Sequence, residues 1–153
     1  MKRNHTMMQF FEWNVESDGQ LWNTLRKLAP ELKIRGIDSL WIPPVTKGLT
    51  VHDAGYGAYD LYDLGEFEQK GTVRTKYGTK QELLDAIVTC KEQAIAVYVD
   101  LVMNHKAGAD ETEVFQVIEV NPENRTEDIS EPFDIEGWTK FTFPGRGNTY
   151  SSL

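Results

Sequence analysis

Cysteine, long apolar segments and clustered basic residues are all scarce in this sequence. Its 153 residues include one cysteine, Cys90, so a scaffold of internal disulfides is excluded. No stretch approaches the roughly 18 apolar residues that a membrane-spanning helix needs. The first residues, up to Glu12, lack the apolar core of a signal peptide. From these absences we expect a cytoplasmic protein without a membrane segment.

The charge balance is acidic, with 24 Asp and Glu against 16 Lys and Arg and a formal net charge of -8. Nucleic acids and anionic membranes bind proteins through clustered Lys and Arg, and here the basic residues are scattered. We therefore expect neither kind of partner. A neutral polymer such as a polysaccharide is compatible with an acidic protein, and so is a calcium ion.

Apolar patterns over the first hundred residues alternate between strand and helix. Short apolar or β-branched runs predict strands at 7–11, 37–42 and 95–102, and the third of these has the composition of a central strand. Helical spacing predicts a helix from Leu21 and another from Thr79 to about Gln93. Strands alternating with helices are typical of parallel βα units.

The expected helices carry start and stop signals. Thr79 and Glu82 have the spacing of a capping box, and Gly36 is a suitable C-terminal cap for the first helix. Pro30 lies inside the first helical pattern and is expected to kink or split it. On the second helix, Cys90 shares a face with apolar residues, so we interpret it as a small buried side chain rather than a reactive thiol.

The pattern changes after the third strand. A strand is expected at 114–120 and a turn at 121–124, and Phe133, Ile135, Phe141 and Phe143 then alternate with polar residues. These features predict antiparallel hairpins. Three parallel strands cannot close a barrel, which needs eight. The sequence therefore reads as the first part of a larger fold.

Polar residues end the third strand in the segment DLVMNH at 100–105. Asp100 falls inside the expected third strand, and a carboxylate buried in such a strand must be paired or hydrogen-bonded. Asn104 offers a neutral oxygen that suits a hard cation such as calcium, and His105 can hydrogen-bond a sugar hydroxyl. A purely structural role, in which Asn104 and His105 cap the strand, is equally open from these residues alone.

A long loop rich in glycine and tyrosine spans 45–78, too long for a simple connector and therefore expected to be functional. Within it, GYGAYDLYDLGEF occupies 55–67. A tyrosine ring offers an apolar face to a sugar ring and a hydroxyl to its polar groups. We interpret the remaining polar and aromatic residues of the segment as loop structure; these are Tyr59, Asp60, Tyr62, Asp63 and Glu66.

The sequence resembles the α-amylase family of retaining glycoside hydrolases, in particular its bacterial liquefying and cytoplasmic members. DLVMNH at 100–105 is similar to the family's first signature on strand three. MMQFFEW at 7–13 and GIDSLWIPP at 36–44 resemble strands one and two. The loop segments at 55–67 and 69–79 are the most specific part of the resemblance, and FPGRG at 143–147 resembles the inserted B domain.

The resemblance implies an α/β fold and a division of the chain. Residues 1–105 would form the first three βα units of a TIM (β/α)8 barrel, and residues 106–153 would begin an inserted, antiparallel β-rich B domain. The substrate would be an α-glucan, hydrolysed at internal α-1,4 bonds with retention of configuration.

The resemblance also implies roles for single residues. Tyr56 would stack on the sugar at the cleavage subsite and His105 would hydrogen-bond the same sugar. Asn104 would be one ligand of a calcium ion between the barrel and the B domain. Asp100 and Trp13 would support the site, and Asp100 would not be the nucleophile.

No catalytic carboxylate is expected in this chain. A retaining glycosidase needs two carboxyl groups roughly 5–5.5 Å apart, and the family takes them from later strands. We therefore expect the 153-residue chain to be inactive alone and its calcium site to be incomplete. Two alternatives stay open: a non-catalytic glucan-binding module, and a partner whose missing barrel half comes from a second chain.

Overall fold

The computed structural model describes residues 4–151. Its contacts divide the chain into two compact units, one made of Met1–Ala107 with Phe143–Leu153 and the other of Gly108–Thr142. We expected residues 106–153 to form one region, the beginning of a B domain, whereas the contacts group 106–107 and the segment from Phe143 onward with the first unit. Within the described part of the chain, no helix is long and apolar enough to cross a membrane.

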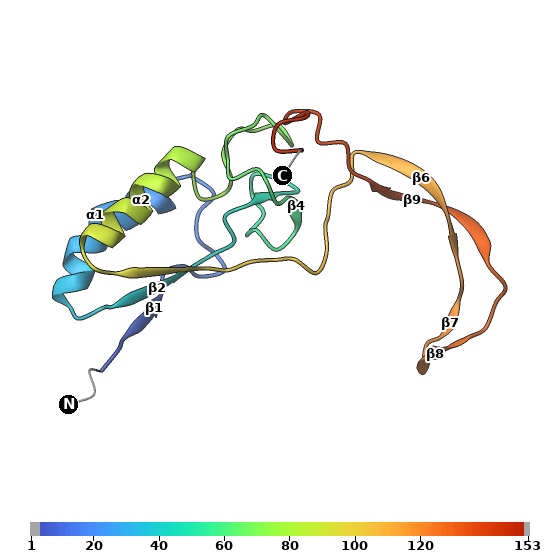
Figure 1. Cartoon of the computed structure of the whole chain (residues 1–153), viewed down its shortest axis with the longest axis horizontal. Coiled ribbons are helices and arrows are strands. Elements are labelled where there is room, and N and C mark those ends of the chain that lie inside the picture. Colours follow the sequence, from blue (N-terminus) through green and yellow to red (C-terminus); the bar gives the residue numbers. More distant parts are fainter. Residues whose placement is uncertain (1–3, 152–153) are drawn as a thin grey trace. The chain divides into compact units, whose positions relative to one another are not determined.

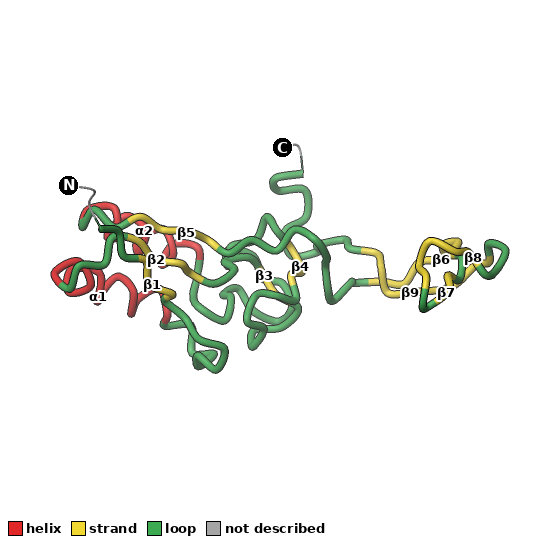
Figure 2. The backbone as a smooth tube through the Cα atoms, turned by 90° about the horizontal axis from the view of Figure 1, so that it is seen from below, coloured by secondary structure: helices red, strands yellow, loops and turns green. Residues whose placement is uncertain are grey.

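Three parallel strands form the sheet of the first unit (Figures 1 and 2). They are β1 (Met7–Gln9), β2 (Ser39–Ile42) and β5 (Ala96–Val99), in the order β1-β2-β5. The predicted strands are confirmed, although each is shorter than expected. The predicted central position of the third strand is wrong for this sheet, because β2 pairs with a neighbour on both sides and β5 pairs only with β2 among the described strands.

Two helices connect these strands, α1 (Leu21–Ile34) and α2 (Lys80–Glu92). The capping box that begins α2 is confirmed: the Thr79 side chain accepts a hydrogen bond from the Glu82 amide, and the Glu82 carboxylate accepts one from the Thr79 amide at 2.8 Å. These two bonds satisfy amide groups that the first turn of a helix would otherwise leave without partners.

Gly36 ends α1 as predicted, with a φ of +88°. Its amide donates to the Lys33 carbonyl and the Ile37 amide donates to the Leu32 carbonyl, both at 3.0 Å, which is the Schellman pattern. Of the two effects expected of Pro30, a split of the helix is wrong, because α1 is continuous from Leu21 to Ile34. Tertiary packing of its apolar face outweighs the single hydrogen bond that a proline removes.

The hydrophobic core lies between these helices and one face of the sheet (Figure 1). On β2, Leu40 and Ile42 point into this core and are fully buried, while Trp41 between them is partly exposed on the opposite face. The other fully buried members of the core are Trp22, Leu25, Ala29, Ala86 and Cys90. Cys90 is therefore a core side chain, as predicted, and burial raises the pKa of its thiol to about 11.

The long loop between β2 and α2 contains a small antiparallel pair that the sequence did not indicate. Strand β3 (Lys47–Gly48) pairs with β4 (Ala58–Asp60), and Figure 2 labels both. All five of these residues are buried. The segment is therefore an ordered layer over the carboxyl ends of the sheet strands rather than an irregular connector.

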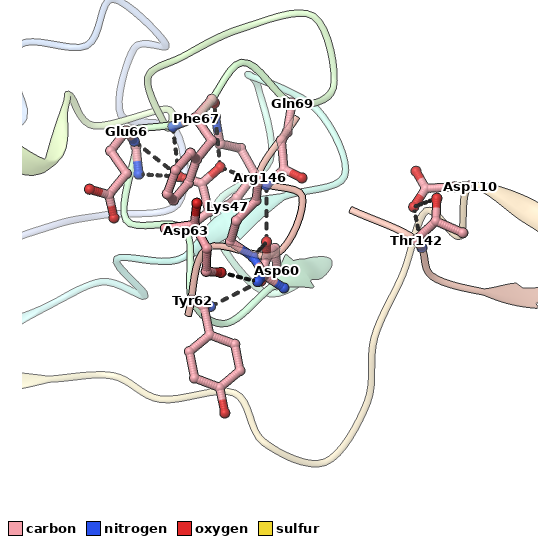
Figure 3. Close-up of polar contacts among 12 residues, drawn as sticks. Lys47, Asp60, Tyr62, Asp63, Glu66, Phe67, Gln69, Asp110, Thr142 and Arg146 are labelled. Carbon is pink, nitrogen blue, oxygen red and sulfur yellow. Dashed lines mark hydrogen bonds and ion pairs between the residues drawn. The ribbon is translucent and has the colours of Figure 1, made fainter. Parts of the chain in front are cut away.

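A buried lysine and aspartate hold this layer together (Figure 3). Lys47 Nζ lies 3.3 Å from Asp63 Oδ2, and the two side chains are 2% and 0% exposed. The lysine also donates to three backbone carbonyls, those of Phe67, Thr72 and Val73, at 2.6–3.0 Å. Burial lowers the pKa of Lys47, and the nearby Asp63 carboxylate opposes that shift.

A second buried pair extends the same cluster. Arg146 Nε donates to Asp60 Oδ2 at 2.6 Å, and Gln69 Nε2 donates at 3.0 Å to both Asp60 and Asp63. Figure 3 shows these contacts, together with the bond from the Tyr62 amide to Asp60. We name Lys47, Asp60, Asp63, Gln69 and Arg146 the buried polar cluster. It binds residues 143–151 to the loop at 45–78.

The second unit is a long antiparallel hairpin, as the sequence predicted. It carries ten acidic and two basic residues, so the whole net charge of -8 lies in this unit and the first unit is neutral. The strands are β6 (Glu111–Val117) paired with β9 (Phe133–Lys140), and β7 (Val120–Asn121) paired with β8 (Asn124–Asp128).

Phe143 does not continue the strand pattern of the hairpin as expected. It belongs to the first unit, has a φ of +49°, and packs edge-on against Tyr59 with ring centroids 5.3 Å apart.

We expect Lys47→Met to lower the free energy of unfolding by about 3 kcal/mol, because Asp63 would stay buried without its cation. Urea unfolding measures the change. Arg35→Met is the matched control, since Arg35 forms an exposed pair with Glu31 on α1 and should cost less than about 0.5 kcal/mol. Equal effects of the two substitutions would contradict a structural role for the buried pair.

Candidate functional site

Four of the residues expected at the site meet where the sheet strands end. Trp13 follows β1, Asp100 directly follows β5, and His105 lies five residues further along the chain. Tyr56 comes from the loop that precedes β4. In parallel α/β barrels this carboxyl-terminal side of the sheet is where active sites are built.

The Tyr56 hydroxyl donates a hydrogen bond of 2.7 Å to Asp100 Oδ2. Asp100 is itself positioned by its amide, which donates to the Ile42 carbonyl at 3.0 Å and extends the pairing of β2 with β5. Burial, followed by the bond to Asp100, raises the pKa of Tyr56 to about 12. Tyr56 is therefore a neutral phenol near pH 7, and the half-buried Asp100 has the hydrogen-bond partner that its position requires.

His105 reaches the main chain of the same tyrosine. Its Nε2 lies 2.7 Å from the Tyr56 carbonyl oxygen, and a carbonyl can only accept, so Nε2 carries the proton in this contact. The Nδ1 atom is then the ring nitrogen that can accept a hydrogen bond from a hydroxyl group when the imidazole is neutral. His105 is exposed, so a ligand can reach it.

Trp13 stacks on the Tyr56 ring, with centroids 5.8 Å apart and planes inclined by 16°. Trp13 is 70% exposed. One face of the Tyr56 ring is thus covered by another aromatic ring, and Trp13 adds its own accessible surface. Stacked aromatic rings give a flat apolar surface next to polar groups, which matches the alternation of C–H faces and hydroxyl groups on a sugar.

Asn104, the expected calcium ligand, is exposed. Across residues 4–151, no group of three or more His, Cys, Asp or Glu side chains is placed to hold a metal ion. Calcium requires six to eight oxygen ligands, and one amide oxygen does not supply them. The described residues do not by themselves fit a calcium ion.

Asp53 was not singled out in the sequence, yet it contacts the backbone of the site. Its Oδ1 accepts hydrogen bonds from the amides of Gly55 and Gly57, which flank Tyr56. The signal available in the sequence was an aspartate two residues before a glycine, which is common in turns and therefore weak. Lys47, Gln69 and Arg146 of the buried polar cluster were also missed.

Residues 8–140 match the family described as alpha amylase, catalytic domain. The chain belongs to the α-amylase family. It is 58% identical over 150 residues to a glucan 1,4-alpha-maltohexaosidase from Bacillus sp. (strain 707) and 55% identical over 150 residues to an alpha-amylase from Geobacillus stearothermophilus. It is also 47% identical over 152 residues to a cytoplasmic alpha-amylase from Escherichia coli (strain K12).

These α-amylase relatives are considerably longer than this chain. The three alignments cover 98%, 98% and 99% of the chain but only 29%, 27% and 31% of the respective relatives. The chain thus spans less than a third of the relatives it matches.

Two solved structures are similar in fold to this chain. Truncated alternansucrase from Leuconostoc mesenteroides matches with a TM-score of 0.68 at 19% identity, over 86% of this chain and 13% of that one. Alternansucrase in complex with isomaltotriose matches with a TM-score of 0.63 at 21% identity, over 77% and 12% of the two chains. The family and these neighbours assign the chain to a TIM-barrel family.

Asp100→Asn should lower the pKa of Tyr56 from about 12 toward its ordinary value of 10.0, without reaching it because burial remains. Since the folded-state pKa is raised, the phenol stabilises the fold below pH 10 and loses this contribution between pH 10 and about pH 12. The Asp100→Asn variant should lose this contribution to stability at a lower pH within the same range. Ultraviolet titration of tyrosinate, with Tyr56→Phe subtracted, measures the pKa. An unchanged pKa would contradict the electrostatic effect of the Asp100 carboxylate on Tyr56.

Proposed function

We propose that this chain supplies part of the substrate-binding floor of an α-amylase that hydrolyses internal α-1,4-glucosidic bonds of starch or glycogen with retention of configuration. The observation that carries the proposal is the convergence of Trp13, Tyr56, Asp100 and His105 at the strand ends, in a chain of the α-amylase family. The neutral charge of the first unit is compatible with an uncharged polymer as ligand.

Each of the four residues has a proposed task. Trp13 and Tyr56 present aromatic surface to a sugar ring, and His105 hydrogen-bonds a hydroxyl of the same sugar. Asp100 holds the Tyr56 hydroxyl, whose hydrogen bond its Oδ2 accepts at 2.7 Å. As the family resemblance implies, the proposal gives Asp100 no role as the nucleophile. The isomaltotriose bound to one structural neighbour is an oligosaccharide, which agrees with a saccharide ligand.

The proposed architecture is three βα units of a TIM (β/α)8 barrel in residues 1–105, followed by the beginning of an inserted B domain in 106–153. The parallel order β1-β2-β5 and the hairpin of β6 with β9 support this division. The sheet face away from the helices supports it too, since Met7, Trp41 and Tyr98 remain exposed there. In a closed barrel these side chains would be covered by further strands.

The proposed catalytic carboxylates and the calcium ion depend on residues outside the described ones. A retaining mechanism needs two carboxyl groups, and the four residues proposed to form the site supply one, that of Asp100. Asn104 is proposed as one calcium ligand in the whole protein, and no step of the proposal depends on the metal. We therefore expect the 153-residue chain to release no reducing ends from starch.

Two other functions are compatible with the exposed aromatic surface. A non-catalytic glucan-binding module would use Tyr56 and the exposed tryptophans. A half-barrel completed by a second chain would cover the exposed face of the sheet. Hydrolysis assays on a protein of the relatives' full length that contains this chain distinguish catalysis from binding, and co-purification with a second polypeptide identifies a split barrel.

Electrophoresis in native gels containing soluble starch tests the proposed binding surface. The unmodified chain should be retarded, and Tyr56→Ala and Trp13→Ala should reduce the affinity by roughly tenfold, as the loss of one buried aromatic face predicts. Tyr62→Ala is the matched control, because Tyr62 is an exposed tyrosine of the same loop outside the site. Unretarded migration of the unmodified chain, or equal effects of all three variants, would contradict the proposal.

A further inference from the structure

We propose that Asp53 is a positioning residue for glucan binding, which fixes the peptide group between Tyr56 and Gly57 that His105 contacts. This inference rests on the proposed function of Tyr56 and His105. It assigns the residue that sets their relative position, and it adds no catalytic group.

Asp53 binds the main chain on both sides of Tyr56 through one oxygen. Its Oδ1 accepts hydrogen bonds from the Gly55 amide at 2.6 Å and the Gly57 amide at 3.0 Å. Hydrogen bonds to a carboxylate are shorter and stronger than those between neutral groups. The backbone on either side of Tyr56 is therefore held by a single half-buried side chain.

One planar peptide group links Asp53 to His105. The group joins the carbonyl of Tyr56 to the amide of Gly57, and these atoms point in opposite directions in a trans peptide. Its oxygen contacts His105 Nε2 at 2.7 Å, and its N–H donates to Asp53. Rotation of this peptide would break both contacts, so the carboxylate of Asp53 indirectly fixes the ring of His105.

Two glycines leave room for the Asp53 carboxylate. A Cβ atom at Gly48 would lie 2.7 Å from the Asp53 Cβ, and a Cβ at Gly57 would overlap Asp53 Oδ2. Neither glycine has a positive φ, so the space they leave, rather than their backbone conformation, explains why a larger residue would not fit. The packing thus holds the carboxylate at the point where both amides reach it.

Further bonds hold the loop around Asp53. The Leu49 amide donates to the Gly57 carbonyl at 2.9 Å, and the Tyr77 hydroxyl donates to the Ala54 carbonyl at 2.9 Å. Neither hydrogen bond involves the N–H of the peptide group between Tyr56 and Gly57. Loss of the Asp53 side chain would consequently free that peptide while the rest of the loop stays anchored.

The 15N signal of His105 Nε2 provides a readout that global stability does not move. In the unmodified chain we expect the chemical shift of a protonated Nε2 held in a hydrogen bond. Asp53→Ala should shift this signal toward that of a solvent-exposed imidazole and weaken maltoheptaose binding roughly tenfold, since two amides lose their acceptor. Asp53→Asn keeps an acceptor oxygen. This variant should leave the His105 signal in place and keep the affinity for maltoheptaose within about twofold of that of the unmodified chain.

Asp18→Ala is the matched control, because Asp18 Oδ1 accepts a bond from the Gln20 amide in another turn, away from Tyr56. It should leave the His105 signal unchanged. An Asp53→Ala variant with an unchanged His105 signal would overturn the inference, and so would an Asp53→Asn variant that behaves like Asp53→Ala.

The inference can fail independently of the proposed function. If the unmodified chain binds no maltoheptaose, the glucan-binding role fails, while the His105 signal still tests the positioning by Asp53. If Asp53→Ala does not fold, hydrogen exchange of the unmodified chain decides. Slow exchange of the Gly55 and Gly57 amides supports the inference, and exchange at the rate of free peptide overturns it.

Discussion

Two buried carboxylates, those of Asp60 and Asp63, are the constraint on which the ordered loop at 45–78 depends. Both are fully buried, and a buried charge is tolerated only when cations and hydrogen-bond donors surround it. Lys47 and Arg146 supply the cations, and Gln69 donates to both carboxylates. Backbone amides complete the shell, since Asp63 Oδ1 accepts from Gly65 at 2.8 Å and Glu66 at 3.0 Å.

This cluster connects the loop layer to the candidate site through β4. The strand begins directly after Gly57, so its position sets where Tyr56 can lie. Ala58 accepts a hydrogen bond from the Ala107 amide at 2.8 Å, and Asp60 binds Arg146. Residues of the first unit thus contact β4 both shortly before and shortly after the hairpin segment in the sequence. The same three-residue strand orders the loop and places Tyr56, the tyrosine proposed to bind sugar.

Local signals predicted the parts of the fold that depend on neighbouring residues. The capping box at Thr79 and the helix end at Gly36 involve residues within five positions of each other, and both were correctly predicted. The parallel strands followed from apolar runs that alternate with helical patterns. Pro30 shows the limit of such signals, because packing of α1 prevailed over a single unfavourable residue.

The buried polar cluster could not be predicted, because its partners are far apart in the sequence. Arg146 and Asp60 are separated by 86 positions, and no periodicity relates them. Asp60 and Asp63 hydrogen-bond within the loop, as the sequence predicted, but nothing local identified Lys47 as their cation. For the candidate site, the family resemblance brought Tyr56, Asp100 and His105 together. Asp53, in contrast, was identified from the structure, through the hydrogen bonds that it accepts from the Gly55 and Gly57 amides.

Hydrogen exchange of backbone amides tests most directly whether the buried carboxylates order this layer. The informative amides are those of Tyr62, Gly65 and Glu66, whose acceptors are the Asp60 and Asp63 side chains. If the cluster holds the loop, we expect these amides to be protected to the same degree as those of β2. Exchange at the rate of free peptide, with β2 still protected, would contradict the central role of Asp60 and Asp63.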